Sequence, residues 1–271
     1  MYPHISHQKD KPILDVRDVS VRYDGRVALN NVSFHLHVGE RIAVVGPNGA
    51  GKSTLFKVVS GVLQPNSGDV TISGSKPTVH SCIAYIPQRS QVDWKFPVSV
   101  ADVVMMGRSA KLGPFNWPKK RDWDFVNQAL ETVEIGDLSK RQISQLSGGQ
   151  QQRMFIARAL AQEAELMLMD EPLTGLDTPA QEGLLDLLDM LRTQKVTVMV
   201  ATHDLEQAAK HFDRIMLLNK KIVAFGDPEN VLQTDNLLSA YGGRFRTVEG
   251  REGLLAVDDS CCDEGAHDHV H

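Results

Sequence analysis

Runs of apolar residues rich in β-branched side chains recur along this chain, and stretches with apolar positions at helical spacing lie between them. The runs at 41–45, 166–169 and 195–201 are short and almost entirely apolar, as in strands that are buried on both faces of a sheet. Helical spacing appears at 55–61 and at 121–133. We therefore expect an α/β fold whose strands end at an edge where open sheets bind ligands.

The ends of the chain and one internal block depart from this pattern. Residues 13–36 alternate in the manner of strands, and Asp24-Gly25 between two such segments predicts a hairpin turn. The internal block begins with loops rich in tryptophan and proline and continues with helical spacing. We expect a loose polar arm at 1–12, one folded unit at 13–241 with the block at about 89–161 inserted in it, and a polar tail at 242–271.

Length and composition agree with a folded protein that stays in the cytosol. With 271 residues, of which 42% are hydrophobic, the chain can bury a sizeable core. The net charge of -5 gives no electrostatic reason to expect nucleic acid as a partner. No apolar stretch approaches the roughly 20 residues that span a bilayer, and the first residues lack the apolar core of a signal peptide. The three cysteines, Cys82, Cys261 and Cys262, form no disulfide framework.

A glycine-rich motif follows the first buried run and precedes a helical segment. The pattern G-x-x-x-x-G-K-[ST] is matched at every fixed position by the stretch Gly46, Pro47, Asn48, Gly49, Ala50, Gly51, Lys52, Ser53 and Thr54. Its glycines let the backbone close round a phosphate, so that several N–H groups and the positive end of the helix point at one anion. Lys52 would place its charge on the β- and γ-phosphates, and the Ser53 hydroxyl can coordinate Mg²⁺. The motif predicts a nucleotide site.

Two adjacent carboxylates end the second buried run. Asp170 and Glu171 follow the apolar residues 166–169, at the edge where an open sheet binds ligands. Because neighbouring side chains on a strand point in opposite directions, we expect the two acids to have separate tasks. Asp170 would hold the Mg²⁺ shell, and Glu171 would orient and polarise the attacking water. A strand end capped by solvated acids is the simpler alternative.

A third pattern lies between these two motifs. Ser147 is a good N-cap, and the sequence from Gln150 onward has the apolar spacing of a helix. Gly148 and Gly149 at the start of this helix would leave its N–H groups open to an anion, which the helix dipole also favours. An ordinary capped helix would explain Ser147 but not the paired glycines.

With these motifs in this order, the chain resembles the ATP-binding subunits of ABC transporters over residues 13–238. The resemblance implies a P-loop NTPase core, with a mixed sheet flanked by helices, an antiparallel β subdomain and an inserted helical subdomain, and ATP and Mg²⁺ as cofactors. Tyr23 matches the residue that stacks on adenine, and Gln88 matches the glutamine that reaches Mg²⁺ and the attacking water. Asp177 matches the D-loop, and His203 the histidine that holds the catalytic base and the water in line.

Two of these matches also have plainer explanations. The aromatic Tyr23 beside Asp24-Gly25 could simply close the hairpin. A lone histidine near a strand end, such as His203, is usually solvated or capping, and its place after the two carboxylates is what favours a role in the site.

The same resemblance implies that a signature pentapeptide has its partner in a second copy of the chain. The pentapeptide consists of Leu146, Ser147, Gly148, Gly149 and Gln150. In the family, this signature faces the γ-phosphate that the phosphate loop of the second copy holds, in a head-to-tail dimer with two ATP molecules in the interface. A single copy is therefore expected to be a poor ATPase. A soluble member of the family that acts in cluster assembly is an alternative to a transporter subunit.

Residues 88–121 indicate a branch of the family. This segment resembles that of manganese, zinc and iron importers, where it contacts a polytopic membrane permease. We expect an ATPase on the cytoplasmic face of the membrane that drives import of a divalent metal ion, with manganese as first candidate, zinc or iron as alternatives, and an extracytoplasmic metal-binding protein in the same system. Trp94, Phe96, Met105 and Met106 could form the permease contact or pack the subdomain.

The polar tail carries another candidate for metal binding. His267, His269 and His271 alternate, so an extended chain would put three imidazoles on one face, and Cys261 and Cys262 could be further ligands. Such donors suit zinc or copper better than manganese, and the tail could weakly buffer or sense metal. A polar end with incidental histidines is the alternative.

Overall fold

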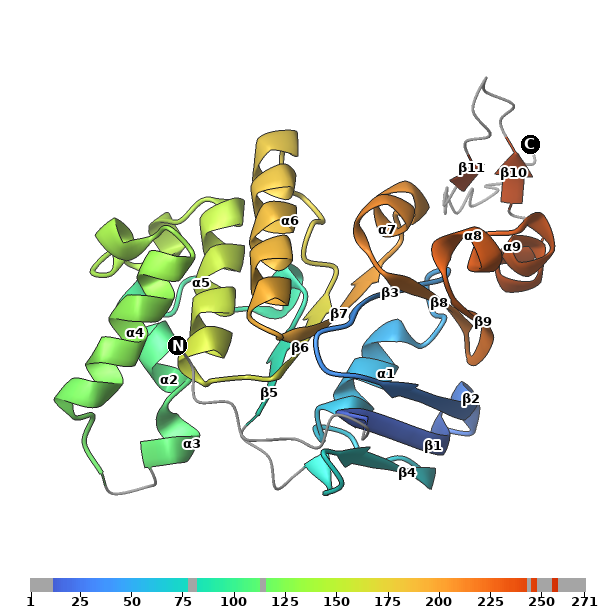
Figure 1. Cartoon of the computed structure of the whole chain (residues 1–271), viewed down its shortest axis with the longest axis horizontal. Helices are drawn as coiled ribbons and strands as arrows, with labels where there is room; N and C mark the ends of the chain where they lie inside the picture. Colours follow the sequence, from blue (N-terminus) through green and yellow to red (C-terminus); the bar gives the residue numbers. More distant parts are fainter. Residues whose placement is uncertain (1–11, 78–81, 113–115, 243–244, 248–254, 258–271) are drawn as a thin grey trace, which may run out of the picture.

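The computed structural model describes residues 12–77, 82–112 and 116–242, together with two short strands at 245–247 and 255–257. A six-stranded sheet with the order β5-β6-β7-β3-β8-β9 lies at its centre (Figure 1). These strands are β5 (Ile83–Ile86), β6 (Leu166–Asp170), β7 (Thr197–Thr202), β3 (Arg41–Val45), β8 (Arg214–Asn219) and β9 (Lys221–Gly226). The first five pair in parallel, and β9 returns antiparallel to β8. The three buried runs of the sequence form β3, β6 and β7, which confirms their assignment as strands.

A second, antiparallel sheet accounts for the alternating segment near the start of the chain. Its strands, in the order β2-β1-β4, are β1 (Leu14–Tyr23), β2 (Arg26–Leu36) and β4 (Ser67–Ile72). Asp24 and Gly25 join β1 to β2 with φ angles of 48° and 79°, a turn conformation that these two residue types favour. The helix α1 (Lys52–Val59) lies between the two sheets, and its Leu55 and Phe56 are fully buried there.

The other helices, labelled in Figure 1, divide along the sequence into two groups, one before and one after β6. The helical subdomain stands at one side of the central sheet and contains α2 (Val100–Met106), α3 (Ser109–Leu112), α4 (Lys120–Thr132) and α5 (Gly148–Ala161). The second group contains α6 (Thr178–Thr193), α7 (Leu205–His211), α8 (Pro228–Val231) and α9 (Thr234–Tyr241). Short 3-10 helices occupy Arg89–Gln91, Gly136–Leu138 and Ile143–Gln145. Within the described residues, no helix has both the length and the apolar composition needed to cross a bilayer.

Two hydrophobic cores hold these layers together. One fills the space between the helical subdomain, α6 and one face of the central sheet. The other lies between the opposite face, α1 and the antiparallel sheet. The strand β3 serves both, because Ala43 and Val45 point into the first core while Ile42 and Val44 point into the second. This double burial explains why the central strands are apolar almost throughout.

Among the described residues near the end of the chain, two short strands form a pair that the sequence pattern did not predict. The strands β10 (Phe245–Thr247) and β11 (Leu255–Val257) form an antiparallel pair. The cysteines and histidines proposed as tail ligands lie outside the described residues, namely Cys261, Cys262, His267, His269 and His271.

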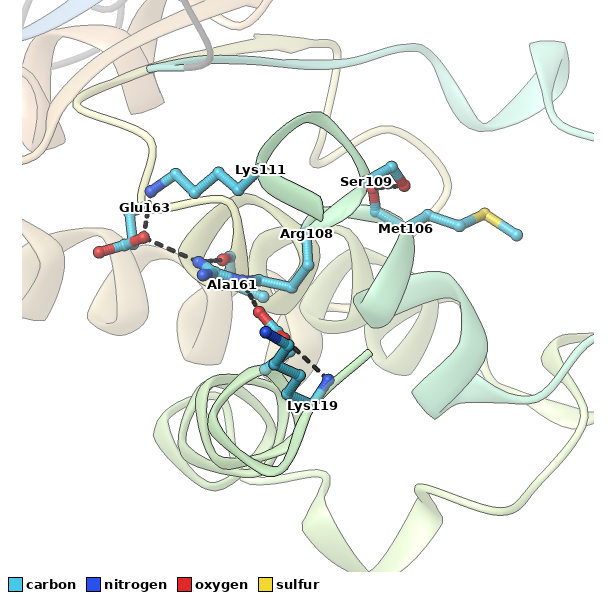
Figure 2. Close-up of polar contacts among 8 residues, drawn as sticks. Met106, Arg108, Ser109, Lys111, Lys119, Ala161 and Glu163 are labelled. Carbon is cyan, nitrogen blue, oxygen red and sulfur yellow. Dashed lines mark hydrogen bonds and ion pairs between the residues drawn. The ribbon is translucent and has the colours of Figure 1, made fainter. Parts of the chain in front are cut away.

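A buried arginine ties three parts of the helical subdomain together, as Figure 2 shows. Arg108, only 4% exposed, follows α2 and donates from Nη1 to the carbonyl oxygen of Ala161 (2.8 Å) and to Glu163 Oε2 (2.7 Å). Its Nε donates to Asp122 Oδ1 at 3.4 Å, in the first turn of α4. Lys111 pairs with the same carboxylate of Glu163. Because Ala161 ends α5, the guanidinium also lies at the favourable, negative end of that helix.

Replacing Arg108 by Met should lower the free energy of unfolding by about 3 kcal/mol, because the variant leaves buried acceptors without their donor. Burial would raise the pKa of Glu163, but hydrogen bonds from Lys111 and Arg108 outweigh it and lower that pKa below the ordinary 4.5. The loss of stability should therefore be at its full size at neutral pH. It should shrink as the pH falls below the ordinary pKa of 4.5 and Glu163 takes up a proton. Urea unfolding at several pH values measures the loss of stability and its dependence on pH. Arg121→Met, at an exposed position of the same subdomain, is the control, and an equal loss there would contradict the assignment.

Candidate nucleotide-binding site

The glycine-rich segment forms a tight loop between β3 and α1, and its shape depends on glycine at two positions. A Cβ atom on Gly46 would lie 2.0 Å from the carbonyl oxygen of Leu218, at the end of β8. Gly51 has a φ of +100°, and a Cβ atom there would lie 2.6 Å from the carbonyl oxygen of Ala28. Both approaches are too close for any side chain, so the loop packs against its neighbours through bare backbone.

Neighbouring backbone also fixes this loop from behind. The carbonyl oxygen of Ala50 accepts a hydrogen bond from the backbone N–H of Lys220 (2.7 Å), between β8 and β9. The carbonyl oxygen of Lys220 in turn accepts from the N–H of Asn30 on β2 (2.6 Å). The loop is thus tied to both sheets, and its N–H groups lead into the N-terminus of α1, where an anion is favoured.

Lys52 begins α1 and folds back over the loop. Its Nζ donates to the carbonyl oxygens of Gly46 (2.6 Å) and Pro47 (3.4 Å), and the residue is 7% exposed. A cation held at the mouth of a loop of backbone N–H groups makes an anion site in which charge and hydrogen bonds act together.

Asp170 ends β6 and is buried beside this loop. The residue is 3% exposed, and its Oδ2 is fully buried without a hydrogen-bond partner. Burial raises the pKa of Asp170, with a smaller contribution from Glu171, while the Ser53 hydroxyl and the cations of Lys52 and Lys57 oppose the rise. A carboxylate oxygen with nothing to bind, next to a hydroxyl, is a donor set that fits Mg²⁺, which prefers oxygen ligands.

Three side chains from different elements meet at Glu171. Gln88, which follows β5, donates from Nε2 to Glu171 Oε2 at 3.3 Å. Thr174 donates its hydroxyl to the same oxygen at 3.2 Å. The other oxygen, Oε1, faces His203 Nδ1 at 3.9 Å, and the His203 side chain, just after β7, is 53% exposed. The structure therefore brings together Gln88, Glu171 and His203, the three residues that the sequence analysis assigned to catalysis.

Glu171 is separated from Asp170 by a backbone turn rather than by strand alternation. The strand β6 ends at Asp170, and Glu171 has a φ of 50°, in the left-handed region. Its N–H donates to the carbonyl oxygen of Ala201 on β7 at 3.0 Å, which holds the turn. The two acids have separate surroundings, as we expected, but the physical reason is the left-handed turn.

The signature pentapeptide caps α5 as its sequence predicts. Ser147 Oγ accepts from the N–H of Gln150 (3.3 Å), and Gln150 Oε1 accepts from the N–H of Ser147 (3.0 Å), so the two form a reciprocal capping box. A Cβ atom on Gly148 would lie 2.9 Å from Leu176 Cδ2, and one on Gly149 would lie 3.0 Å from the Ala180 Cβ. The paired glycines thus also let α5 approach the start of α6, a packing reason that the sequence did not reveal.

The remaining candidates take defined places. Asp177 is the N-cap of α6, where its Oδ1 accepts from the N–H of Ala180 at 3.0 Å. Tyr23 ends β1 opposite Arg26, next to the predicted turn, and is 45% exposed. It is free to stack on a flat ligand, although closing the hairpin would also account for it, so its adenine role stays a prediction.

Two neighbours of the site carry no motif and were not predicted. Thr174 orients Glu171, as described above. Burial and the charge of Asp170 raise the pKa of Tyr85, on β5, to about 12, so its hydroxyl stays neutral beside that acid. Neither the spacing nor the residue type marks these positions in the sequence, because their place depends on contacts between distant strands.

A phosphate loop, a buried acid beside its serine and a Gln–Glu–His cluster at one sheet edge define an ATP-binding cassette. The family model described as ABC transporter matches residues 29–174, and the chain belongs to this family. It is an ABC ATPase, which confirms the predicted fold, enzyme class and use of ATP.

Known proteins are similar to this chain over most of its length. The manganese transport system ATP-binding protein MntB of Bacillus subtilis is 45% identical over 88% of this chain and 96% of its own. The zinc transport system ATP-binding protein TroB of Treponema pallidum is 42% identical over 87% of this chain and 89% of its own. A solved ABC transporter structure in an inward-facing conformation superposes with a TM-score of 0.77 at 32% identity, covering 89% of this chain and 94% of that one.

Replacing Asp170 by Asn should make the nucleotide-free protein more stable by about 1 kcal/mol at pH 7. An acid whose pKa is raised on folding costs stability once it is ionised, and the neutral amide removes that cost while it can still accept from Ser53. The gain should narrow as the pH falls and the parent carboxyl takes up its proton. Thermal unfolding measures this gain in stability, and Asp124→Asn, at an exposed position of α4, serves as the control. Equal or lower stability of the Asp170 variant would contradict a net cost of burying the Asp170 charge.

Proposed function

We propose that this chain is the ATP-hydrolysing subunit of an importer of divalent metal ions, with manganese as the cargo. The convergence of Gln88, Thr174 and His203 on the Glu171 carboxylate, at the sheet edge that carries the phosphate loop, is the observation that carries the hydrolytic part. The cargo rests on the relatives, one of which is named for manganese transport and another for zinc transport. Zinc is therefore the second candidate.

The phosphate loop, at residues 46–54, would bind the triphosphate through its N–H groups and through Lys52. On binding, Lys52 Nζ would exchange its bonds to the carbonyl oxygens of Gly46 and Pro47 for bonds to phosphate oxygens. Ser53, Asp170 and Gln88 are the residues that would hold Mg²⁺, which neutralises charge that develops on the phosphate oxygens.

Glu171 would accept a proton from the attacking water and hold that water in line. Its Oε2 is held by Gln88 and Thr174, so the oxygen Oε1 on the side of His203 is the one that can face the water. The exposed His203 side chain would contact the γ-phosphate and complete the alignment. Charge stabilisation and positioning, rather than covalent chemistry, would thus supply the rate enhancement.

A second copy of the chain would complete each site. Ser147 and the N-terminus of α5 form an anion-binding end whose contacts within the chain run to α6 and to Arg89. In a head-to-tail dimer, this end would meet the γ-phosphate held by Lys52 of the other copy. ATP would then close the dimer, and hydrolysis would open it by removing those contacts.

The helical subdomain offers a surface for a polytopic membrane permease. A groove of about 810 Å³ is lined by Met105, Met106, Trp117 and Trp123, and the Trp117 side chain is 88% exposed. An exposed apolar groove of this kind suits docking of a partner helix. Trp94 has another task, since its ring packs edge-to-face on Phe155 with centroids 5.7 Å apart.

In the whole system, the chain would lie at the cytoplasmic face of the membrane. The permease would carry the ion across the bilayer, and an extracytoplasmic metal-binding protein would deliver it. Closure of the ATPase dimer would move the permease between its two orientations.

Glu171→Gln should bind ATP with little change but lose turnover by at least about 100-fold, because the amide cannot take the proton of the water. The variant should accumulate as an ATP-bound dimer, which sedimentation velocity detects. Lys52→Ala is the matched comparison, since it should lose nucleotide binding itself. Normal turnover of the Glu171 variant would refute the assigned role, and unchanged nucleotide affinity of the Lys52 variant would refute the phosphate site.

Cells that lack this chain should accumulate several-fold less manganese from medium in which manganese is limiting. Elemental analysis of cells supplied with manganese, zinc or iron in turn measures the cargo. The parent chain should restore uptake, and Glu171→Gln should not. If only zinc or only iron accumulation falls, that metal is the cargo instead of manganese. Unchanged accumulation of all three metals would reject metal import.

A further inference from the structure

Arg89 connects the glutamine beside Glu171 to the signature helix. It directly follows Gln88, and its Nε donates to Gln151 Oε1 at 2.6 Å. Gln151 is 4% exposed, and its own Nε2 donates to the carbonyl oxygen of Leu146 at 3.3 Å. Two hydrogen bonds therefore lead from the segment after β5 to the backbone of the signature pentapeptide.

A second contact joins the same segment to the same face of α5. Trp94 donates from its indole Nε1 to the carbonyl oxygen of Arg89 at 3.0 Å. Its ring packs on Phe155, four residues beyond Gln151 and thus on the same side of the helix. The segment 89–94 is attached to α5 at both points, so the two should move as one body.

The guanidinium of Arg89 also lies against the first residue of α5. A Cβ atom on Gly148 would lie 3.1 Å from Arg89 Nη1. A cation at the positive end of a helix dipole is unfavourable on its own, so the bond to Gln151 must hold it there. An anion bound at this helix end would attract the Arg89 guanidinium, so the arrangement would then be electrostatically favourable.

We infer that Arg89 is a positioning residue that links the two ATP sites of the dimer. Through Gln88 it adjoins Glu171, which would act in the site of its own copy, and through Gln151 it holds the signature, which would act in the site of the other copy. Nucleotide at one site would thereby set the signature geometry for the other. The inference rests on the proposed function, because it needs the head-to-tail dimer.

Arg89→Met should leave ADP binding to the single copy within about two-fold of the parent, since the phosphate loop is untouched. The concentration of a hydrolysis-resistant ATP analogue that gives half-maximal dimer should rise at least about five-fold, because the variant loses the charge-assisted hydrogen bond to Gln151, the residue that holds the signature backbone. The Hill coefficient of ATP hydrolysis should fall toward 1. Calorimetry, sedimentation velocity with Mg²⁺ and the analogue, and steady-state ATPase rates measure the three quantities.

Three companion variants make the test specific. Lys95→Met removes an exposed cation from the same segment and should behave as the parent. Arg89→Lys keeps the charge but loses the planar donor, and should recover at most part of the dimerisation. Gln151→Met should resemble Arg89→Met, and the double variant should be no worse than either single one, because both remove the same bond.

The outcomes separate this inference from the function on which it rests. A parent that fails to dimerise with the analogue would overturn the head-to-tail dimer and the inference with it. A parent that dimerises while Arg89→Met does so equally well would overturn the inference alone. Full recovery of dimerisation by Arg89→Lys would also overturn the inference, since a positive charge without the bond to Gln151 would then be enough. Loss of ADP binding in Arg89→Met would overturn it as well.

Discussion

Parallel hydrogen bonding among β3, β6 and β7 is the constraint on which the rest of the structure depends. The register pairs Val45 with Thr202 and Asp170 with Ala201, so the three strands end level with one another. Since these strands are buried on both faces, their polar and charged side chains lie where the strands end. The phosphate loop, the two acids and His203 therefore share one edge, although long stretches of sequence separate them.

The signature helix is held differently at its two ends. At its C-terminus, Arg108 binds the carbonyl oxygen of Ala161, where the helix dipole and the cation attract each other. At its N-terminus, Arg89 lies against Gly148, where the dipole and the cation repel each other. The helix dipole thus favours the cation at the C-terminus, whereas the hydrogen bond to Gln151 holds the cation at the N-terminus. A single helix is therefore fixed in the core at one end, and its other end is the one that we propose as an anion contact.

Local sequence was enough to predict the features that depend on local physics. The strands β3 and β6, the phosphate loop and the N-cap Ser147 all follow from residue types at fixed spacing. Thr174, Tyr85 and Arg89 could not be found in this way, because each acquires its role from a partner on another element. The left-handed backbone of Glu171 is a similar case, since the bond to Ala201 on β7 stabilises it. The paired glycines of the signature were recognised, but the packing against Leu176 and Ala180 that also requires them was not.

The phosphate loop packs closely against Leu218 and Ala28 and accepts a hydrogen bond from Lys220, and this packing has a thermodynamic consequence. A loop that is already shaped by two sheets loses little conformational freedom when a ligand enters, so almost all of the contact energy is available for affinity. The entropy change of nucleotide binding to one copy should then be dominated by water and counter-ions instead of by ordering of the chain. In the proposed head-to-tail dimer, the conformational cost would be concentrated in the later step, when the signature end of each copy settles against the phosphate loop of the other. A protein of this kind would bind ATP with little ordering of the chain, and the entropic cost of ordering would arise mainly when the dimer assembles.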